Sequence, residues 1–169
     1  MNEHQARGHQ GKRQRPLVLT VDDEPCIGRV VQLKLQNAGY DVVRANSGAE
    51  GLEKFVELRP DVLITDVKMP GMSGIELCAR CEEYREAWPF LIIVLTSQLD
   101  EQTQAWLQKG PHRSYLPKPF SPREILRTVQ EYMGRAGRQR EPAAEEAVAE
   151  EPVAEEPVAE EAVAEGVTS

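Results

Sequence analysis

The amino-acid sequence predicts an α/β domain in which a doubly wound, parallel sheet of five strands carries helices on both faces. Three of its apolar runs are near-continuous stretches of Val, Ile and Leu, as expected for strands buried on both faces. Helical apolar patterns separate these runs, and such alternation favours a parallel sheet with right-handed crossovers. The alternating region, residues 16–134, is long enough to bury one core.

The elements follow from short-range patterns. The predicted strands are the apolar runs at residues 17–21, 41–44, 62–65, 90–95 and 114–116. Between them, apolar residues recur at helical spacing, and three predicted helices begin with the capping-box pairs Ser47 and Glu50, Ser73 and Glu76, and Ser121 and Glu124. Five strands and five helices in this length indicate a flavodoxin-like fold with strand order 2-1-3-4-5, in which ligands bind at the carboxyl ends of the strands.

The formal net charge of −8 is unevenly distributed along the chain. Residues 1–15 carry four basic side chains and one acidic side chain, whereas ten glutamates lie from Glu141 onward. We therefore expect a disordered basic arm at 1–15, the folded domain at 16–134 and a disordered acidic repeat tail at 135–169. Neither the charge of the domain nor the two tryptophans favour direct binding of nucleic acid.

The acidic tail is repetitive. It contains four copies of a five-residue repeat, EEAVA, EEPVA, EEPVA and EEAVA, with no aromatic residue. Such a segment buries too little apolar surface to offset the entropy lost on ordering, and Pro152 and Pro157 would each break a helix. An ordered helix that binds a partner is the alternative.

The composition also excludes several classes of protein. The longest apolar run, residues 90–95, is too short to cross a bilayer, so we expect no membrane insertion. The amino end lacks the apolar segment of a secretory signal. Three cysteines fit a reducing compartment better than a disulfide framework, so we expect a cytoplasmic protein.

Polar residues gather where the predicted strands end: Asp22 and Asp23 after the first, Asp66 after the third, Thr96 after the fourth and Lys118 after the fifth. Two carboxylates about 4 Å apart repel each other by roughly 4 kcal/mol at an effective dielectric constant near 20, so this edge needs a cation. Oxygen ligands of this kind suit Mg²⁺, and Lys118 adds a compact positive charge. The simpler alternative is that Asp22 and Asp23 only cap the following helix.

Four motifs, VDDEP, ITDVKMPGMSG, VLTS and YLPKPF, occur in this order at the ends of the first, third, fourth and fifth predicted strands. Together they resemble the receiver domain of bacterial response regulators, over residues 16–134. The resemblance implies a phosphoacceptor switch of a two-component system or phosphorelay. A sensor histidine kinase or a histidine phosphotransfer protein would supply the phosphate, and a downstream protein would be the target. It implies no enzyme beyond catalysis of its own phosphoryl transfer and dephosphorylation.

The same resemblance assigns roles to the residues that would react or bind. Asp66 resembles the phosphorylated aspartate, and Lys118 resembles the lysine that pairs with the phosphoryl group. Asp22, Asp23, Asp66 and the backbone carbonyl of Lys68 resemble the Mg²⁺ ligands. The chemistry is consistent with these residue types, because a carboxylate can be the nucleophile in phosphoryl transfer and a metal and a lysine can stabilise the developing charge.

The resemblance also concerns the switch. Thr96 resembles the switch hydroxyl, and Tyr115 resembles the aromatic residue that turns inward on activation, with ordinary core packing as the alternative for Tyr115. The family uses a cis peptide bond where this chain has Lys118–Pro119, so we expect one here. The loop at residues 109–113 departs from the small-residue Gly-Ala-Asp usual before the fifth strand, and this departure concerns how the domain would signal to a downstream partner.

Other functions fit only some of these residues. Haloacid dehalogenases also phosphorylate a strand-end aspartate, but they place a carboxylate two residues later, where this chain has Lys68. An FMN-binding flavodoxin needs a loop rich in glycine and hydroxyls after the first strand, whereas this chain has DDEP. A pseudo-receiver that only binds a partner would lack Asp23, Asp66 or Lys118, and all three are present. The pseudo-receiver stays the alternative function.

Cys78 and Cys81 form a CxxC pair on the third predicted helix. A zinc site would need two further ligands, and His112 supplies only one. Because both cysteines lie at positions predicted to face inward, we expect unreactive core thiols rather than a redox or zinc pair.

Overall fold

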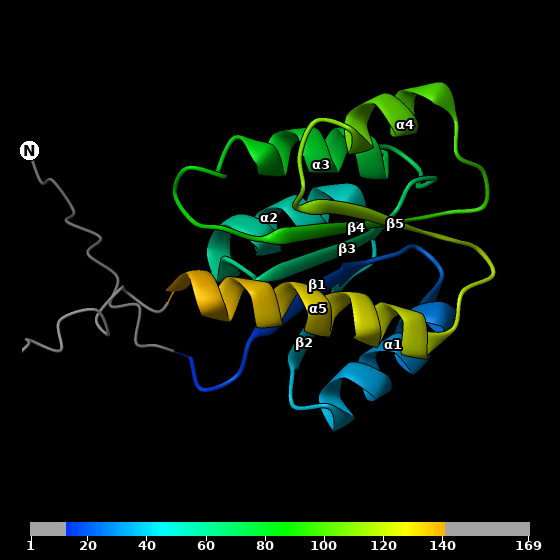
Figure 1. Cartoon of the computed structure of the whole chain (residues 1–169). Helices are drawn as coiled ribbons and strands as arrows, with labels where there is room; N and C mark the ends of the chain where they lie inside the picture. The colour runs from blue at the N-terminus through cyan, green and yellow to red at the C-terminus, as the bar shows by residue number, and fades with distance from the viewer. Residues whose placement is uncertain (1–12, 141–169) are drawn as a thin grey trace, which may run out of the picture.

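The computed structural model describes residues 13–140, in which five parallel strands alternate with five helices (Figure 1). The strands are β1 (Leu17–Val21), β2 (Asp41–Ala45), β3 (Val62–Asp66), β4 (Leu91–Thr96) and β5 (Arg113–Pro117). The helices are α1 (Pro25–Asn37), α2 (Gly48–Leu58), α3 (Gly74–Glu82), α4 (Glu101–Leu107) and α5 (Pro122–Arg140). The strand order is β2-β1-β3-β4-β5, so the predicted fold class and strand order are confirmed.

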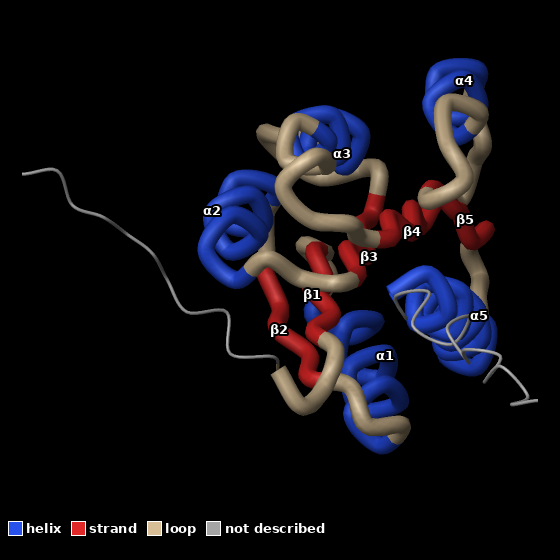
Figure 2. Tube along the Cα trace, turned by 60° about the vertical axis from the view of Figure 1, so that its left-hand side comes forward, coloured by secondary structure: helices blue, strands red, loops and turns tan. Residues whose placement is uncertain are grey.

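The sheet forms the middle of three layers. Helices α1 and α5 cover one face, and α2, α3 and α4 cover the other (Figures 1 and 2). Every residue of β1, β3 and β4 is buried, as the near-continuous apolar runs predicted. Leu35, Ile125 and Val129 form the core under α1 and α5, whereas Phe55 and Leu77 belong to the core on the opposite face.

The helix starts follow the predicted capping patterns with one difference. Ser73 and Ser121 each form a complete capping box with the glutamate three residues later. Ser47 caps α2 through its side chain, which accepts a hydrogen bond from the backbone of Glu50. The carboxylate of Glu50, however, accepts from the backbone N–H of Asn46 instead of that of Ser47, so this box is only half formed.

Two element boundaries differ from the expectation in ways that matter for the site. β3 and β4 each extend one residue further than predicted and end on Asp66 and Thr96. These two side chains therefore belong to the last residue of a strand and not to the loop that follows. Backbone pairing between the two strands, which matches Asp66 with Leu95, fixes their positions.

The ends of the domain also need correction. Helix α5 continues past the expected boundary at residue 134 to Arg140. Arg, Ala and Gln favour a helix here, and Pro142 disfavours helical backbone at the residue before it. At the other end, the Arg13 guanidinium donates to the carbonyls of Leu58 and Arg59, so the predicted arm contacts the end of α2. Residues 1–12 and the four repeats lie outside the described residues.

Cys78 and Cys81 are fully buried free thiols on α3, which confirms their predicted inward position. Burial raises the pKa of Cys78 well above its ordinary value and raises the pKa of Cys81 to about 12. Reactive thiolates are therefore disfavoured at both positions. Between residues 13 and 140, no helix has the length and apolar character needed to cross a membrane.

Candidate functional site

Three carboxylates meet at the carboxyl edge of the sheet. Asp22 and Asp23 directly follow β1, and Asp66 is the last residue of β3, so the pairing of these neighbouring strands brings them together. One oxygen from each of Asp22, Asp23 and Asp66 lies within 4.8 Å of the other two. Asp22 and Asp66 are buried, whereas Asp23 is exposed. The convergence that the strand order predicts is therefore present.

Asp22 is the carboxylate that the protein leaves incompletely paired. Its Oδ1 accepts a hydrogen bond of 2.8 Å from the backbone N–H of Glu24, at the start of α1. Its Oδ2 is buried and has no hydrogen-bond partner. Burial, with the nearby charges of Asp66 and Asp23, raises the pKa of Asp22, although the Glu24 hydrogen bond and Lys118 act in the opposite direction. Glu24 is the N-cap residue of α1, and no side-chain capping bond is present there, so the capping alternative does not account for Asp22.

Lys118 supplies the positive charge that contacts the cluster. Its Nζ lies 3.0 Å from Oδ2 of Asp66, and the two side chains are only 20% and 10% exposed. The backbone N–H of Lys118 donates to the carbonyl of Thr96 at 2.7 Å, which ties the end of β5 to the end of β4. The Lys118–Pro119 peptide bond is cis, as predicted.

Thr96 is buried and hydrogen-bonded locally, whereas Tyr115 is exposed. The Thr96 hydroxyl donates to the Gln98 carbonyl at 2.6 Å and accepts from the Gln98 backbone N–H at 3.1 Å. Tyr115 on β5 is 40% exposed, so the core-packing alternative for this side chain is wrong. The sequence gives no signal that the backbone of Gln98 holds this hydroxyl, because the contact depends on local chain geometry and not on residue type.

An open groove runs beside the carboxylate cluster and connects it with the start of α4. Asp23, Lys68 and Glu76 line it together with Asp100, the N-cap residue of α4. The hydrogen bonds from Thr103, chiefly that of its backbone N–H, lower the pKa of Asp100, and the charge of Lys68 contributes in the same direction. Lys68 is exposed and lines the groove, and the role of its backbone carbonyl as a metal ligand stays a prediction.

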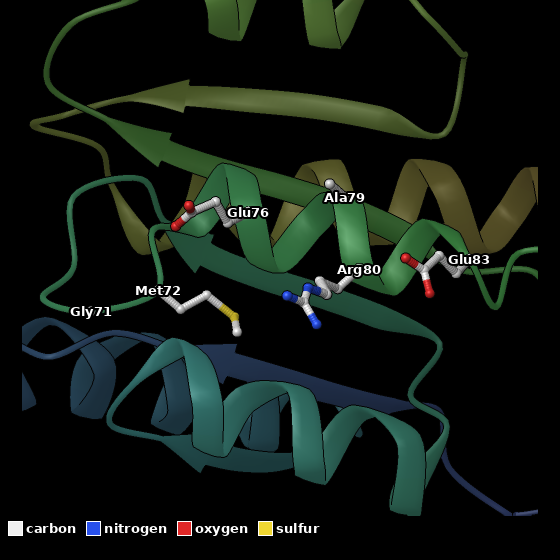
Figure 3. Close-up of a pocket in the computed structure, with 6 residues that line it drawn as sticks. All are labelled: Gly71, Met72, Glu76, Ala79, Arg80 and Glu83. Atoms are coloured by element: carbon white, nitrogen blue, oxygen red, sulfur yellow. The ribbon is translucent and has the colours of Figure 1, made fainter.

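A second groove lies over the outer face of α3 (Figure 3). Arg80 and Met72 project into the space between α3 and α2, and Glu76 lies near the loop that precedes α3. The lining residues include none of the strand-end residues Asp22, Asp66, Thr96 or Lys118. This groove is therefore separate from the strand-end residues.

A family model described as the response regulator receiver domain matches residues 18–130. The chain belongs to this family. Among curated relatives of the receiver, the alkaline phosphatase synthesis transcriptional regulatory protein PhoP of Bacillus subtilis is 34% identical over 119 residues, which covers 70% of this chain and 49% of PhoP. The DNA-binding transcriptional regulator NtrC of Escherichia coli is 35% identical over 129 residues, which covers 76% of this chain and 27% of NtrC.

Solved receivers share the fold along almost their whole length. The chemotaxis protein CheY4 of Vibrio cholerae has 35% identity and a TM-score of 0.61, and the match covers 69% of this chain and 98% of CheY4. In contrast, the chain spans about half the length of the first curated relatives, 49% and 48%. The family and its phosphorylation-dependent signalling are therefore shown for the receiver, and what the longer relatives do beyond it is not carried over.

Proposed function

We propose that this receiver accepts a phosphoryl group on Asp66 from a histidine kinase or a histidine phosphotransfer protein and then changes the surface that it offers to a downstream protein. The observation that carries this proposal is the geometry at Asp66. Its carboxylate meets those of Asp22 and Asp23 within 4.8 Å and also contacts the Lys118 ammonium at 3.0 Å. A pseudo-receiver has no use for this arrangement.

The residues present fit Mg²⁺. Three carboxylate oxygens converge, and one buried oxygen of Asp22 has no hydrogen-bond partner among residues 13–140, which is the condition that a hard cation would relieve. Asp22, Asp23, Asp66 and the backbone carbonyl of Lys68 would hold the ion. When bound, Mg²⁺ would neutralise the cluster and polarise the oxygens of an incoming phosphoryl group.

In the proposed transfer, Asp66 is the nucleophile. A bond forms between its carboxylate oxygen and phosphorus while the bond from phosphorus to the donor's imidazole nitrogen breaks, and the electron pair leaves with the donor. Lys118, already at Asp66, would pair with a phosphoryl oxygen. Because Asp66 is only 7% exposed, little of the reacting carboxylate is open to solvent beforehand.

The arrangements of Thr96 on β4 and Tyr115 on β5 support a switch. The Thr96 hydroxyl is hydrogen-bonded to the Gln98 backbone and not to Asp66, and Tyr115 is exposed. After phosphorylation, Thr96 would donate to the phosphoryl group and Tyr115 would turn inward beside it. The docking face around α4 and β5 would change as a result.

The remaining proposals concern context. The receiver would act by protein contact, without binding nucleic acid directly, and would catalyse only its own phosphorylation and dephosphorylation. We propose the cytoplasm as its compartment, since Cys78 and Cys81 are free thiols that persist in reducing surroundings.

The direct test is incubation with acetyl phosphate followed by intact-mass measurement. Wild type should gain one phosphoryl adduct in Mg²⁺ and at least tenfold less in EDTA. Asp66→Asn keeps the shape of the side chain but removes the nucleophile, so its adduct should vanish. Asp23→Asn should slow labelling without moving it. An adduct that persists on Asp66→Asn, or that forms equally well in EDTA, contradicts the proposal.

A further inference from the structure

A second charged cluster lies at the opposite, amino edge of the sheet, where α3 ends and β5 begins. Its centre is Glu82, whose carboxylate accepts from Arg85 Nε at 2.9 Å and from Arg113 Nε at 3.0 Å. The Glu82 and Arg113 side chains are 17% and 10% exposed. Burial alone would raise the pKa of Glu82, but the hydrogen bonds from the two guanidinium groups lower it overall. The carboxylate is therefore held charged between two arginines.

Arg113 also holds the last turn of α4. Its Nη1 donates to the carbonyl of Trp106 at 2.6 Å, and its guanidinium carbon lies 4.7 Å from the centroid of the Trp106 ring. Trp106 is 7% exposed and packs into the core under α4. A cation suits this place because the carbonyls at a helix C-terminus lack partners and carry partial negative charge. One side chain thus joins the ends of α3 and α4 to the start of β5.

The other end of α4 is held differently. Asp100 accepts from the backbone N–H of Thr103 at 2.7 Å, a bond within the helix itself. Asp100, Glu101 and Gln102 are exposed, and Thr103 is the first buried residue of the helix. Within residues 13–140, each side-chain hydrogen bond in the structure that ties α4 to another element lies at its C-terminal end. The start of α4 therefore has the weaker attachment.

The geometry points to a pivot. We propose that Arg113 fixes the C-terminal end of α4 to α3 and β5, so that the switch moves the N-terminal end of this helix and leaves its last turn in place. This inference rests on the proposed function, because Thr96 and Gln98 lie just before the free end and would start the movement. Arg113, which fixes the last turn of α4, belongs to the loop at residues 109–113 that departs from the family's usual sequence.

Arg85 provides a matched control. It pairs with the same carboxylate, at 2.9 Å, and its guanidinium carbon lies 3.8 Å from the centroid of the Phe90 ring. It also donates to the Phe90 carbonyl, so its hydrogen bonds and ring contact involve Glu82 and Phe90 and none reaches α4. Arg85→Lys and Arg113→Lys therefore remove the same kinds of interaction, and only the second one releases α4.

The experiment is amide hydrogen exchange, measured by mass spectrometry on the full chain with and without acetyl phosphate and Mg²⁺. Without the phosphodonor, Arg113→Lys should accelerate exchange of the amides of Gln108 and Lys109, which close the last turn of α4, at least tenfold. Arg85→Lys should change the exchange rates of these two amides less than twofold. Amides of β1 and β4 report global unfolding. Trp106→Leu, which removes the ring, should also accelerate amide exchange in the last turn of α4.

With the phosphodonor, wild type should show faster exchange near Thr103 and Gln104 and unchanged exchange at Lys109. Equal acceleration at both ends of α4, or equal effects of Arg113→Lys and Arg85→Lys on the last turn, would overturn the pivot. Intact mass in the same samples separates the two ideas. Absence of an adduct contradicts the proposed function and with it the movement, while the comparison of the unphosphorylated variants decides whether Arg113 is the anchor.

Discussion

The two edges of the sheet handle buried charge in opposite ways. At the carboxyl edge, three carboxylates share one contacting ammonium group, and a buried oxygen of Asp22 is left without a partner. At the amino edge, the single carboxylate of Glu82 is shared by two guanidinium groups. The first arrangement leaves an excess of negative charge that a further cation would balance, whereas the carboxylate of the second is paired within the protein.

The difference is visible in how the fold shifts the pKa of each carboxyl group. At the carboxyl edge, burial raises the pKa of Asp22, whereas at the amino edge the hydrogen bonds from Arg85 and Arg113 overcome burial and lower the pKa of Glu82. Ionisation of Asp22 therefore costs stability, and ionisation of Glu82 contributes stability. We infer that one edge is built to react and the other to hold α3, α4 and β5 together.

The largest expected loss of stability comes from removing the Glu82 carboxylate at the amino edge. Glu82→Gln leaves two largely buried guanidinium groups without a carboxylate, so we expect the free energy of unfolding to fall by about 2–4 kcal/mol. Urea denaturation measures this difference. Glu83→Gln, the exposed neighbouring change, should stay within about 0.5 kcal/mol of wild type. Equal effects of the two substitutions would mean that the network does not stabilise the fold.

At the carboxyl edge, replacing a carboxylate by an amide should raise the free energy of unfolding instead of lowering it. The folded pKa of Asp22 is raised above 3.8, so its contribution to stability is full below that value and is lost as the pH rises through the folded pKa. Asp22→Asn should therefore raise the free energy of unfolding at pH 7 in EDTA. Exposed Asp41→Asn should change little, and destabilisation by Asp22→Asn would contradict the comparison.

His112 should make the stability of the amino edge depend on pH. Its Nε2 lies 3.6 Å from Glu82 Oε1, and burial together with the charge of Arg85 lowers its pKa. Its contribution to stability is thus present above pH 6.5 and is lost as the pH falls through the folded pKa. Unfolding curves between pH 7.5 and 5 should show this loss in wild type and not in His112→Gln, with a difference below about 1 kcal/mol. Parallel pH profiles would show that His112 is uncoupled from the network.

The smallest effect is expected from the tail. A chain that ends at Arg140 keeps both edges, and the removed repeats carry little apolar area. Its melting temperature should lie within a few degrees of that of the full chain, since 1 kcal/mol corresponds to about 4 °C in a domain of this size. A larger loss in differential scanning calorimetry would show that the repeats bind the domain.

The carboxyl edge could be predicted from the sequence because strand order alone brings strand ends together. The convergence of Asp22, Asp66 and Lys118 could be predicted without knowledge of side-chain packing. The amino edge could not be predicted, because Glu82 and Arg113 are separated by 31 positions and pair through side chains, which leave no periodic signal. The direction of the Thr96 hydroxyl, towards Gln98, likewise depends on local geometry that the residue type does not specify.

The central claim, that the carboxyl edge is completed by a divalent cation, is tested most directly by the melting temperature in Mg²⁺ and in NaCl of matched ionic strength. Wild type should melt several degrees higher in Mg²⁺, since a ligand that binds only the folded state stabilises it. Asp22→Asn should lose most of this increase, whereas Glu82→Gln, although less stable, should keep it. Equal melting temperatures of wild type in the two salts, or an undiminished increase in Asp22→Asn, would contradict the account.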